Sequence, residues 1–358
     1  MSDPAHKETD RLLKEMEKRI AREYRQAERE VAAKLDDYMR RFKIKDKTWN
    51  LWVKTGQKTK KEYQEWRLGQ MAIGARWEEL RQNLADDFHN ANQIAKSIIN
   101  GYMPEVYAIN HNYATYEVES QSMIDTSYTL YDRQTVERIM RDNPDLLPPP
   151  GKKVSANIAA GKDIRWNNQI IQSVMMQSLL QGESIGKIAT RLAESVGDSN
   201  RKAAIRNART MTTGAENAGR VAGYRRAKAM GIRMKQQWIA TLDGRTRHEH
   251  RQLDGQRVDI GESFEVDGFK IRFPGDPEAP AHLIYNCRCT LIGSLDGFEI
   301  DPEDLGLRRN DKLGGMTYQE WKESKESYSD PITKQDDIEQ MMKNIYTNEY
   351  RYGPKKKR

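Results

Sequence analysis

Residues 238–255 read WIATLDGRTRHEHRQLDG, and within this stretch the sequence changes from helical to β periodicity. Apolar residues fall at even positions between 234 and 242, which predicts a half-buried strand. Asp243-Gly244 then predicts a turn. A small β module therefore begins here.

Downstream signals extend this module. Thr246 and Glu249 have the spacing of a capping box, which predicts a short helix. Asp267-Gly268, between two apolar runs, predicts a hairpin, and the Pro-Gly-Asp-Pro sequence at 274–277 predicts a turn. A final strand is predicted over residues 286–292.

Upstream, the pattern is helical. Asp163 is predicted to cap a helix that ends near Gly182. Ser184 is predicted to begin a second helix, and residues 200–230 are predicted to form a third. The run NPDLLPPPGKK at 143–153 contains four prolines, which predicts a domain boundary because proline removes a backbone donor and fixes φ.

The first 142 residues are also predicted to be mainly helical. Apolar residues recur every three or four positions over 12–42, which predicts one long amphipathic helix. Its stripe either packs on its own chain, the favoured interpretation, or meets another subunit. Helical segments at 60–99 and 132–140 are predicted to flank an extended, Tyr-rich stretch at 102–131.

The predicted fold class is therefore α+β: mostly long amphipathic helices, followed by a small turn-rich β module with one short helix. Five consecutive regions are predicted: an elongated helical assembly region (1–142), a Pro-rich linker (143–162), a helical subdomain (163–232), a Cys/His β module (233–296) and a polar region with one helix and a basic tail (297–358).

Composition narrows the class of protein. Charged residues make up 32% of the 358, against 37% hydrophobic, which suits solvated helices. There is no long apolar run and the first 30 residues are highly charged, so we expect a protein made in the cytoplasm, with no membrane partner. The net charge of +7 makes double-stranded DNA a candidate partner, through a tail formed by Lys355, Lys356, Lys357 and Arg358.

A cluster of histidine and cysteine residues is the main candidate for chemistry. His250, His282, Cys287 and Cys289 could bind a structural Zn²⁺, which would stabilise a module with a small core. The alternative is a metal-free cluster of buried side chains. The two cysteines are too close in sequence for an unstrained disulfide, so we expect them to be reduced or metal-bound.

An enzyme is not the favoured interpretation. Asp243, Glu249, His250 and Asp254 could form a metal-dependent hydrolase site, since carboxylates and imidazole perform acid/base chemistry. The sequence contains no His-Glu-x-x-His pattern, phosphate loop, nucleophile elbow or dinucleotide fingerprint. Such residues in a turn are more often structural, so we expect no enzymatic activity and no catalytic residue.

The order of these motifs resembles the phage head-morphogenesis, or Mu F-like, minor capsid proteins. The resemblance covers roughly residues 166–293. Its motif positions are Trp238, Asp243, Arg245, Arg247, His250, Leu253, Asp254, Gly255, Phe264, His282, Asn286, Cys287, Arg288 and Cys289.

The resemblance implies a virion protein at the portal vertex of the head that supports head assembly, genome packaging or genome delivery. It implies the phage portal protein, scaffold or major capsid protein as partners. It also implies that the protein is located in the host cytoplasm during assembly. Some members carry a C-terminal toxin or transferase domain; the residues after Gly293 are too few for one, so we expect the structural form. An accessory protein that travels with the DNA is the alternative.

Overall fold

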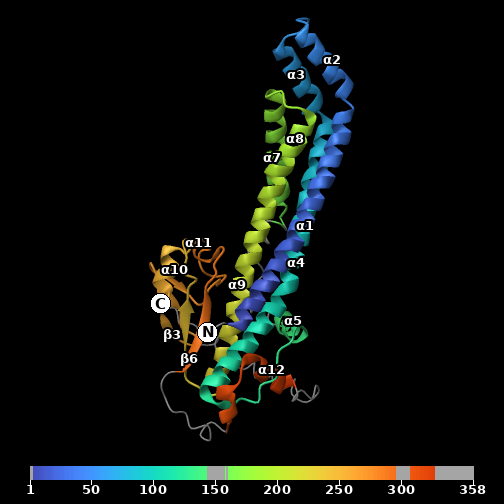
Figure 1. Ribbon diagram of the computed structural model, residues 1–358. Helices are drawn as coiled ribbons and strands as arrows, with labels where there is room; N and C mark the ends of the chain where they lie inside the picture. Colours follow the sequence, from blue (N-terminus) through green and yellow to red (C-terminus); the bar gives the residue numbers. More distant parts are fainter. Residues whose placement is uncertain (1–2, 143–157, 159, 296–306, 327–358) are drawn as a thin grey trace, which may run out of the picture. The chain divides into compact units, whose positions relative to one another are not determined.

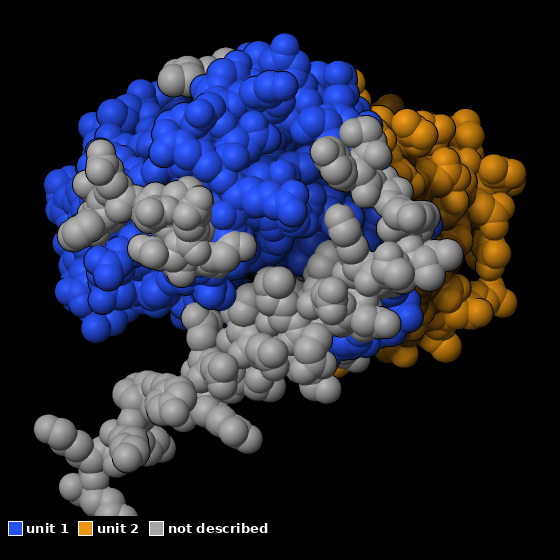
Figure 2. All heavy atoms as spheres, turned by 90° about the horizontal axis from the view of Figure 1, so that it is seen from below, with its two compact units in different colours: residues 1–13, 102–148, 209–358 blue, residues 14–101, 149–208 orange. Residues whose placement is uncertain are grey.

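The computed structural model describes residues 3–142, 158, 160–295 and 307–326 (Figure 1). The chain forms two compact units, coloured in Figure 2. Unit 1 contains residues 1–13, 102–148 and 209–358, and unit 2 contains residues 14–101 and 149–208. The units interleave along the sequence, whereas the five predicted regions are consecutive. Most of the predicted linker and the whole basic tail lie outside the described residues.

Three long helices contribute residues to both units. They are α1 (Pro4–Arg40), α4 (Ala75–Ser122) and α9 (Asp198–Ala229). The remaining helices of unit 2 are α2 (Lys43–Lys54), α3 (Lys60–Met71), α7 (Lys162–Leu180) and α8 (Ile185–Leu192), and a π-helical turn at Ala193–Gly197 joins α8 to α9. The prediction of long helices followed by a small β module is confirmed.

The core of unit 2 follows the apolar stripe of α1. Met16, Ile20 and Leu35 are completely buried, and Phe88 of α4 and Met175 of α7 are equally inaccessible. The repeat of three and four residues places these side chains on one helix face, which packs against the other helices of unit 2. The structure confirms that the stripe packs within its own chain.

The prediction of an extended stretch at 102–131 is wrong for residues 102–122, because α4 continues to Ser122. Pro104 lies inside the helix and leaves one backbone carbonyl without its usual donor. Val106, Tyr107 and Val118 are nevertheless buried, and packing of this length of helix outweighs the local cost.

Two predicted caps are also wrong. Gly161 occupies the N-cap position of α7, and the Asp163 carboxylate instead lies 2.8 Å from His89 Nδ1 and accepts a 2.8 Å hydrogen bond from Asn92 Nδ2. The short helix α10 (His248–Leu253) has no side-chain cap, because the Thr246 hydroxyl donates to the Thr241 carbonyl. In both cases a competing partner takes the side chain. The helix predicted within residues 297–358 is α12 (Tyr318–Glu326), and Thr317 and Glu320 form a capping box at its start.

The described part of unit 1 contains three small sheets. The central sheet has the antiparallel order β3-β2-β6, formed by Arg257–Asp259, Met234–Ile239 and Thr290–Leu295. β4 (Phe264–Val266) and β5 (Phe269–Ile271) form the predicted hairpin, and β1 (Ile124–Asp125) pairs with β7 (Arg308–Arg309). The remaining elements are α5 (Arg133–Asp142), α11 (Ala281–Ile284) and a 3-10 turn at Asp311–Gly315. The predicted final strand thus begins at 290 rather than 286.

Close packing of α4 against α9 within unit 1 depends on a glycine. A Cβ at Gly219 would lie 2.5 Å from the Tyr107 carbonyl oxygen and 3.1 Å from the His111 nitrogen. Only a residue without a side chain allows the two backbones to approach so closely. This contact positions the face of α9 that receives the β module. Among the described helices of the chain, none combines the length and apolar composition that a membrane crossing requires.

Candidate metal centre

The segment that carries both cysteines is held against α9 by side-chain hydrogen bonds. Thr213 Oγ1 donates to the Cys287 carbonyl at 2.6 Å. The Asn217 amide donates to the Cys289 carbonyl at 3.2 Å and accepts from the Leu291 N–H at 2.9 Å. Because the two α9 residues lie one turn apart, their polar atoms take the place of a further strand along the edge of β6 that is not paired with β2.

Arg220 continues this row one turn further along α9. Its guanidinium is completely buried and donates to the Leu291 carbonyl at 2.9 Å and to Asn110 Oδ1 at 3.1 Å. Asp3 Oδ2, at 2.5 Å, and the Glu216 carboxylate, at 3.8 Å, compensate its charge. The two carboxylates keep the pKa of Arg220 above its ordinary value although burial lowers it.

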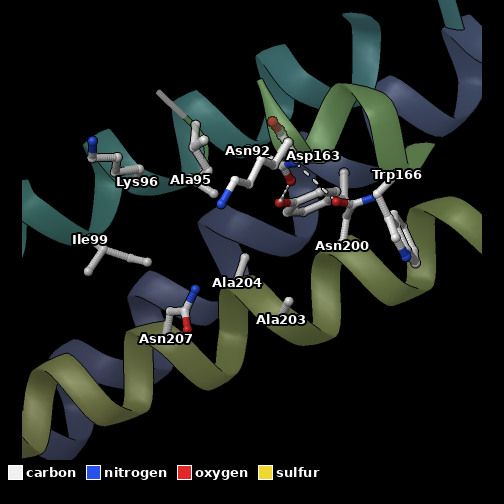
Figure 3. Close-up of a pocket in the computed structure, with 13 residues that line it drawn as sticks. Asn92, Ala95, Lys96, Ile99, Asp163, Trp166, Asn200, Ala203, Ala204 and Asn207 are labelled. Carbon is white, nitrogen blue, oxygen red and sulfur yellow. Dashed lines mark hydrogen bonds between the residues drawn. The ribbon is translucent and has the colours of Figure 1, made fainter. Parts of the chain in front are cut away.

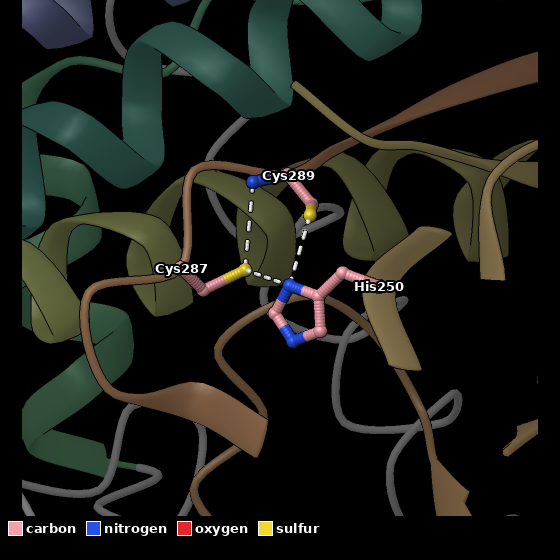
Figure 4. Close-up of side chains that lie close together, drawn as sticks. All are labelled: His250, Cys287 and Cys289. Carbon is pink, nitrogen blue, oxygen red and sulfur yellow. Dashed lines mark hydrogen bonds between the residues drawn. The ribbon is translucent and has the colours of Figure 1, made fainter. Parts of the chain in front are cut away.

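His250 of α10 faces the two cysteines (Figure 4). Its Nδ1 lies 3.3 Å from Cys289 Sγ and 3.7 Å from Cys287 Sγ. All three side chains are 3% exposed. Three ligand atoms from two separate elements therefore converge on one buried point.

The hydrogen bonds around His250 assign its tautomer. Nε2 lies 2.8 Å from the Leu283 carbonyl, which can only accept, so Nε2 carries the proton. The Nδ1 lone pair then faces both sulfur atoms. Metal-binding histidines show the same arrangement, in which a backbone carbonyl fixes the ring through its second nitrogen.

Of the two cysteines, Cys289 is the one that loses its proton more readily. A hydrogen bond from Cys287, together with the neighbouring His250 ring, lowers the pKa of Cys289 to about 5, although burial raises it. The same hydrogen bond, together with burial, raises the pKa of Cys287 well above its usual value. A cation at this point would stabilise negative charge on both sulfur atoms.

The spacing of the three atoms fits a zinc ion. Zn–S bonds of about 2.3 Å and a Zn–N bond of about 2.0 Å in a tetrahedral site require nitrogen-to-sulfur separations of about 3.5 Å. The observed separations of 3.3 Å and 3.7 Å lie on either side of this value. Little rearrangement of the side chains would be needed.

The loop between β2 and α10 also holds the cysteine segment. Asp243 forms a bidentate ion pair with Arg288, at 2.6 and 2.7 Å, which lowers the pKa of the carboxyl group. Arg247 donates to the Tyr285 carbonyl, and Thr241 Oγ1 donates to the Arg288 carbonyl at 2.8 Å. The segment is therefore fixed by side chains of two elements, α9 and this loop.

The other motif residues mostly have structural roles. Trp238 and Leu253 are completely buried, and the Trp238 ring meets His250 edge-on at 5.9 Å. Asp254 accepts from the Ala240 N–H at 2.8 Å, and Gly255 adopts a φ of +79°, which favours glycine. Arg245 is exposed and approaches only Asp243 among the described residues, at 3.7 Å.

The structure does not bring His282 to the cluster. Its side chain is exposed and packs edge-on against the Phe269 ring at 5.4 Å. The proposed four-ligand set is thus reduced to three described residues, His250, Cys287 and Cys289. Asn286 is exposed, with a φ of +53° and its N–H donated to Thr210 Oγ1 at 3.2 Å. The DNA-contact candidates Lys355, Lys356, Lys357 and Arg358 lie outside the described residues.

Sequence reasoning assigned no role to the α9 side chains that hold the cysteine segment. Thr210, Thr213, Asn217 and Arg220 recur every three or four residues, which places them on one face. This row of polar residues within an Ala-rich helix was the sequence signal that could have predicted their role. A lone polar stripe normally indicates solvent exposure, so only the fold shows that it is buried.

A separate cavity of about 350 Å³ lies within unit 2 (Figure 3). Tyr24 donates to Asn92 Oδ1 at 2.6 Å, and the Asn92 amide group donates to Asp163 and to Asn200 at 2.8 and 3.0 Å. Ala95, Ile99, Ala203 and Ala204 supply apolar lining. Tyr24, Asn92, Asp163 and Asn200 thus form one hydrogen-bonded network, which favours a role in packing the helices of unit 2.

Comparisons with known proteins agree with this architecture. Residues 169–292 match the family model described as Phage Mu protein F like protein. The chain is 27% identical over 260 residues to the minor head protein GP7 of Bacillus phage SPP1, covering 69% of this chain and 77% of GP7. No solved structure matches the chain.

A second relative is an enzyme by name. The NAD(+)--arginine ADP-ribosyltransferase EFV of Enterococcus faecalis is 29% identical over 246 residues, which is 68% of this chain but 46% of the transferase. The chain therefore spans less than half of that relative. Residues 169–292 therefore form a Mu F-like domain, and over 69% of its length the chain is similar to a phage minor head protein.

Proposed function

We propose that this protein is a structural component of the phage head that associates with the portal vertex and supports head assembly and genome packaging or delivery. The family match is the observation that carries the proposal. The proposed location is the virion, after assembly in the host cytoplasm, with the portal as first partner and scaffold or major capsid protein as others.

The site supports a structural rather than a catalytic role. Asp243 is engaged by Arg288, and Asp254 by the Ala240 N–H, so two of the three carboxylates of the alternative hydrolase site hold the fold. His250, Cys287 and Cys289 are each 3% exposed, which leaves little room for a substrate. The alternative role in DNA binding rests on the basic tail and on the net charge of +7.

Purification of phage particles and procapsids tests this function. We expect the protein to co-purify with portal-containing procapsids and to be present in mature virions. A strain that lacks the protein should make heads with defective assembly or DNA delivery. Absence of the protein from both particles would contradict the proposal.

We further propose that His250, Cys287 and Cys289 bind a structural Zn²⁺. The Nδ1 lone pair, the depressed pKa of Cys289 and the tetrahedral spacing of the three atoms support this assignment. The metal would cross-link α10 to the segment before β6, adding binding energy to a module with short strands. Water or a partner group would be the fourth ligand.

Zinc content tests the metal site. Protein purified without chelator or histidine tag should contain about one zinc per chain, as expected for a single site. Cys289→Ser should greatly reduce this ratio, whereas His282→Ala, which changes an exposed ring outside the cluster, should retain it. Folded wild-type protein with a zinc ratio near zero would contradict the site, and loss of zinc in the His282→Ala variant would contradict the three-ligand assignment.

A further inference from the structure

Helix α2 presents apolar side chains to solvent. It forms a helical hairpin with α3, at the end of unit 2 where α1 ends and α4 begins (Figure 1). No residue of α2 is buried, and Ile44 and Leu51 are 81% and 58% exposed. Because the two residues are seven positions apart, which is about two helical turns, their side chains lie on the same face of the helix. We call Ile44 and Leu51 the apolar strip.

The rest of the hairpin is packed without using the strip. Trp49 of α2 stacks on Trp66 of α3, with ring centroids 5.5 Å apart. Asp46 accepts a 2.7 Å hydrogen bond from the Tyr63 hydroxyl and pairs with Arg67, 3.1 Å from its Nε. These contacts fix the face of α2 toward α3. Ile44 and Leu51 take no part in these contacts and remain mostly exposed.

The strip is bordered by cations. Residues 43–61 contain seven lysines and one acidic residue, Asp46, which is already engaged by α3. At about 100° per residue, Lys43, Lys47 and Lys54 fall along one border of the strip and Lys45 lies beyond the other. All four are exposed and have no ion-pair partner among the residues that the structure describes. The surface thus combines an apolar centre with a positive rim.

We propose that α2 docks, apolar strip first, into a groove with an acidic rim on another head protein, which is the portal under the function proposed above. Apolar anchors at positions i and i+7 of a helix are the usual way in which an amphipathic helix enters a groove. The lysine rim supplies charge complementarity, orienting the helix and speeding association. This inference rests on the proposed function and adds the surface and its chemistry.

The chemistry of the strip favours a protein over DNA or lipid. Phosphates would neutralise the lysines but would not cover Ile44 and Leu51. Trp49 and Trp66 are stacked on each other, so their packed faces are not free to stack on bases. Two aliphatic side chains are also a small apolar face for an interfacial membrane helix.

Binding of full-length protein to the purified portal encoded in the same phage tests the inference. Ile44→Ser/Leu51→Ser should weaken binding at least about tenfold, as expected when central anchors are lost. Lys47→Glu/Lys54→Glu should also weaken binding, with the largest effect at low salt. Matched controls are Leu180→Ser/Leu242→Ser, which removes other apolar residues 49% and 64% exposed, and Lys14→Glu/Lys18→Glu on α1. Both controls should bind like wild type, and all variants should retain wild-type circular dichroism.

The outcomes separate the two proposals. If wild-type protein does not bind the portal, the proposed portal association fails and the docking surface falls with it. If wild-type protein binds and the hairpin variants bind equally well, only the docking surface is wrong. A third outcome is that the hairpin variants keep portal binding but lose the wild-type binding to a short DNA duplex or to anionic phosphatidylglycerol vesicles. That result would assign the surface to DNA or to lipid and would overturn the inference.

Discussion

The folds of unit 2 and of the β module in unit 1 are stabilised by different kinds of contact. Unit 2 depends mainly on the burial of apolar residues along its helices. The β module has strands of three to six residues, and its cysteine segment is held by Thr213, Asn217, Arg220 and Asp243. Repeated apolar contacts spread stability over many residues. Short strands instead depend on a few polar side chains, each with a distinct role.

The strongest test of this contrast is Arg220→Met. The change leaves Asp3 and Glu216 without their buried counter-charge and removes the donor to the Leu291 carbonyl. We expect a loss of about 3–5 kcal/mol in the free energy of unfolding of unit 1. Denaturant unfolding combined with hydrogen exchange of β2 and β6 peptides would measure it. Arg245→Met is the control, since that side chain is 81% exposed; a comparable loss there would contradict the contrast.

A single apolar truncation in unit 2 should have a smaller and more local effect. Leu35→Ala removes a completely buried side chain from the stripe of α1. We expect a loss of about 3 kcal/mol, the usual cost of a cavity in a core. Hydrogen exchange of α1 and α4 peptides from residues 14–101 should report it, with Lys18→Ala as an exposed control. Equal destabilisation by both variants would argue against a stripe-based core.

The N-terminal attachment of unit 1 should depend on pH. Hydrogen bonding to Glu216 at 2.8 Å raises the pKa of His6 to about 9. Since this folded-state pKa lies above the unfolded value of about 6.5, the stabilisation is complete below pH about 6.5 and is lost as the pH rises through about 9. The wild-type advantage over His6→Gln should therefore fall, by on the order of 2 kcal/mol, across that window. Parallel curves for the two proteins in a pH series of denaturant unfolding would contradict the assignment.

The smallest expected effect concerns one hydroxyl of the clamp. Thr213→Val keeps the shape of the side chain but removes the 2.6 Å hydrogen bond to the Cys287 carbonyl. We expect a loss of about 1 kcal/mol. Thr190→Val is the matched control, because that exposed hydroxyl donates only to the Gly186 carbonyl of its own helix. A thermal melt that shows no difference between the two variants would contradict a specific role for Thr213.

The pattern of apolar and polar residues alone was sufficient to predict many of the helices and strands of this protein. The stripe at residues 12–42 predicted α1, and Asp267-Gly268 predicted the β4–β5 hairpin. The helix at 200–230 was also correct to within two residues. These signals are local, since periodicity and turn chemistry act over a few neighbouring residues. The ordered motif string identified the family for the same reason.

Tertiary structure decided what each polar residue contacts. Asp163 and Thr246 have the positions of helix caps in the sequence, but Asn92 and the Thr241 carbonyl are the partners of their side chains in the structure. His282 looked like a ligand beside Cys287, but α11 and the following turn direct it to Phe269. His250 joins the cysteines because α10 and the α9-bound segment converge. Spacing along the chain predicts which residues share a face, but only packing brings separate faces together.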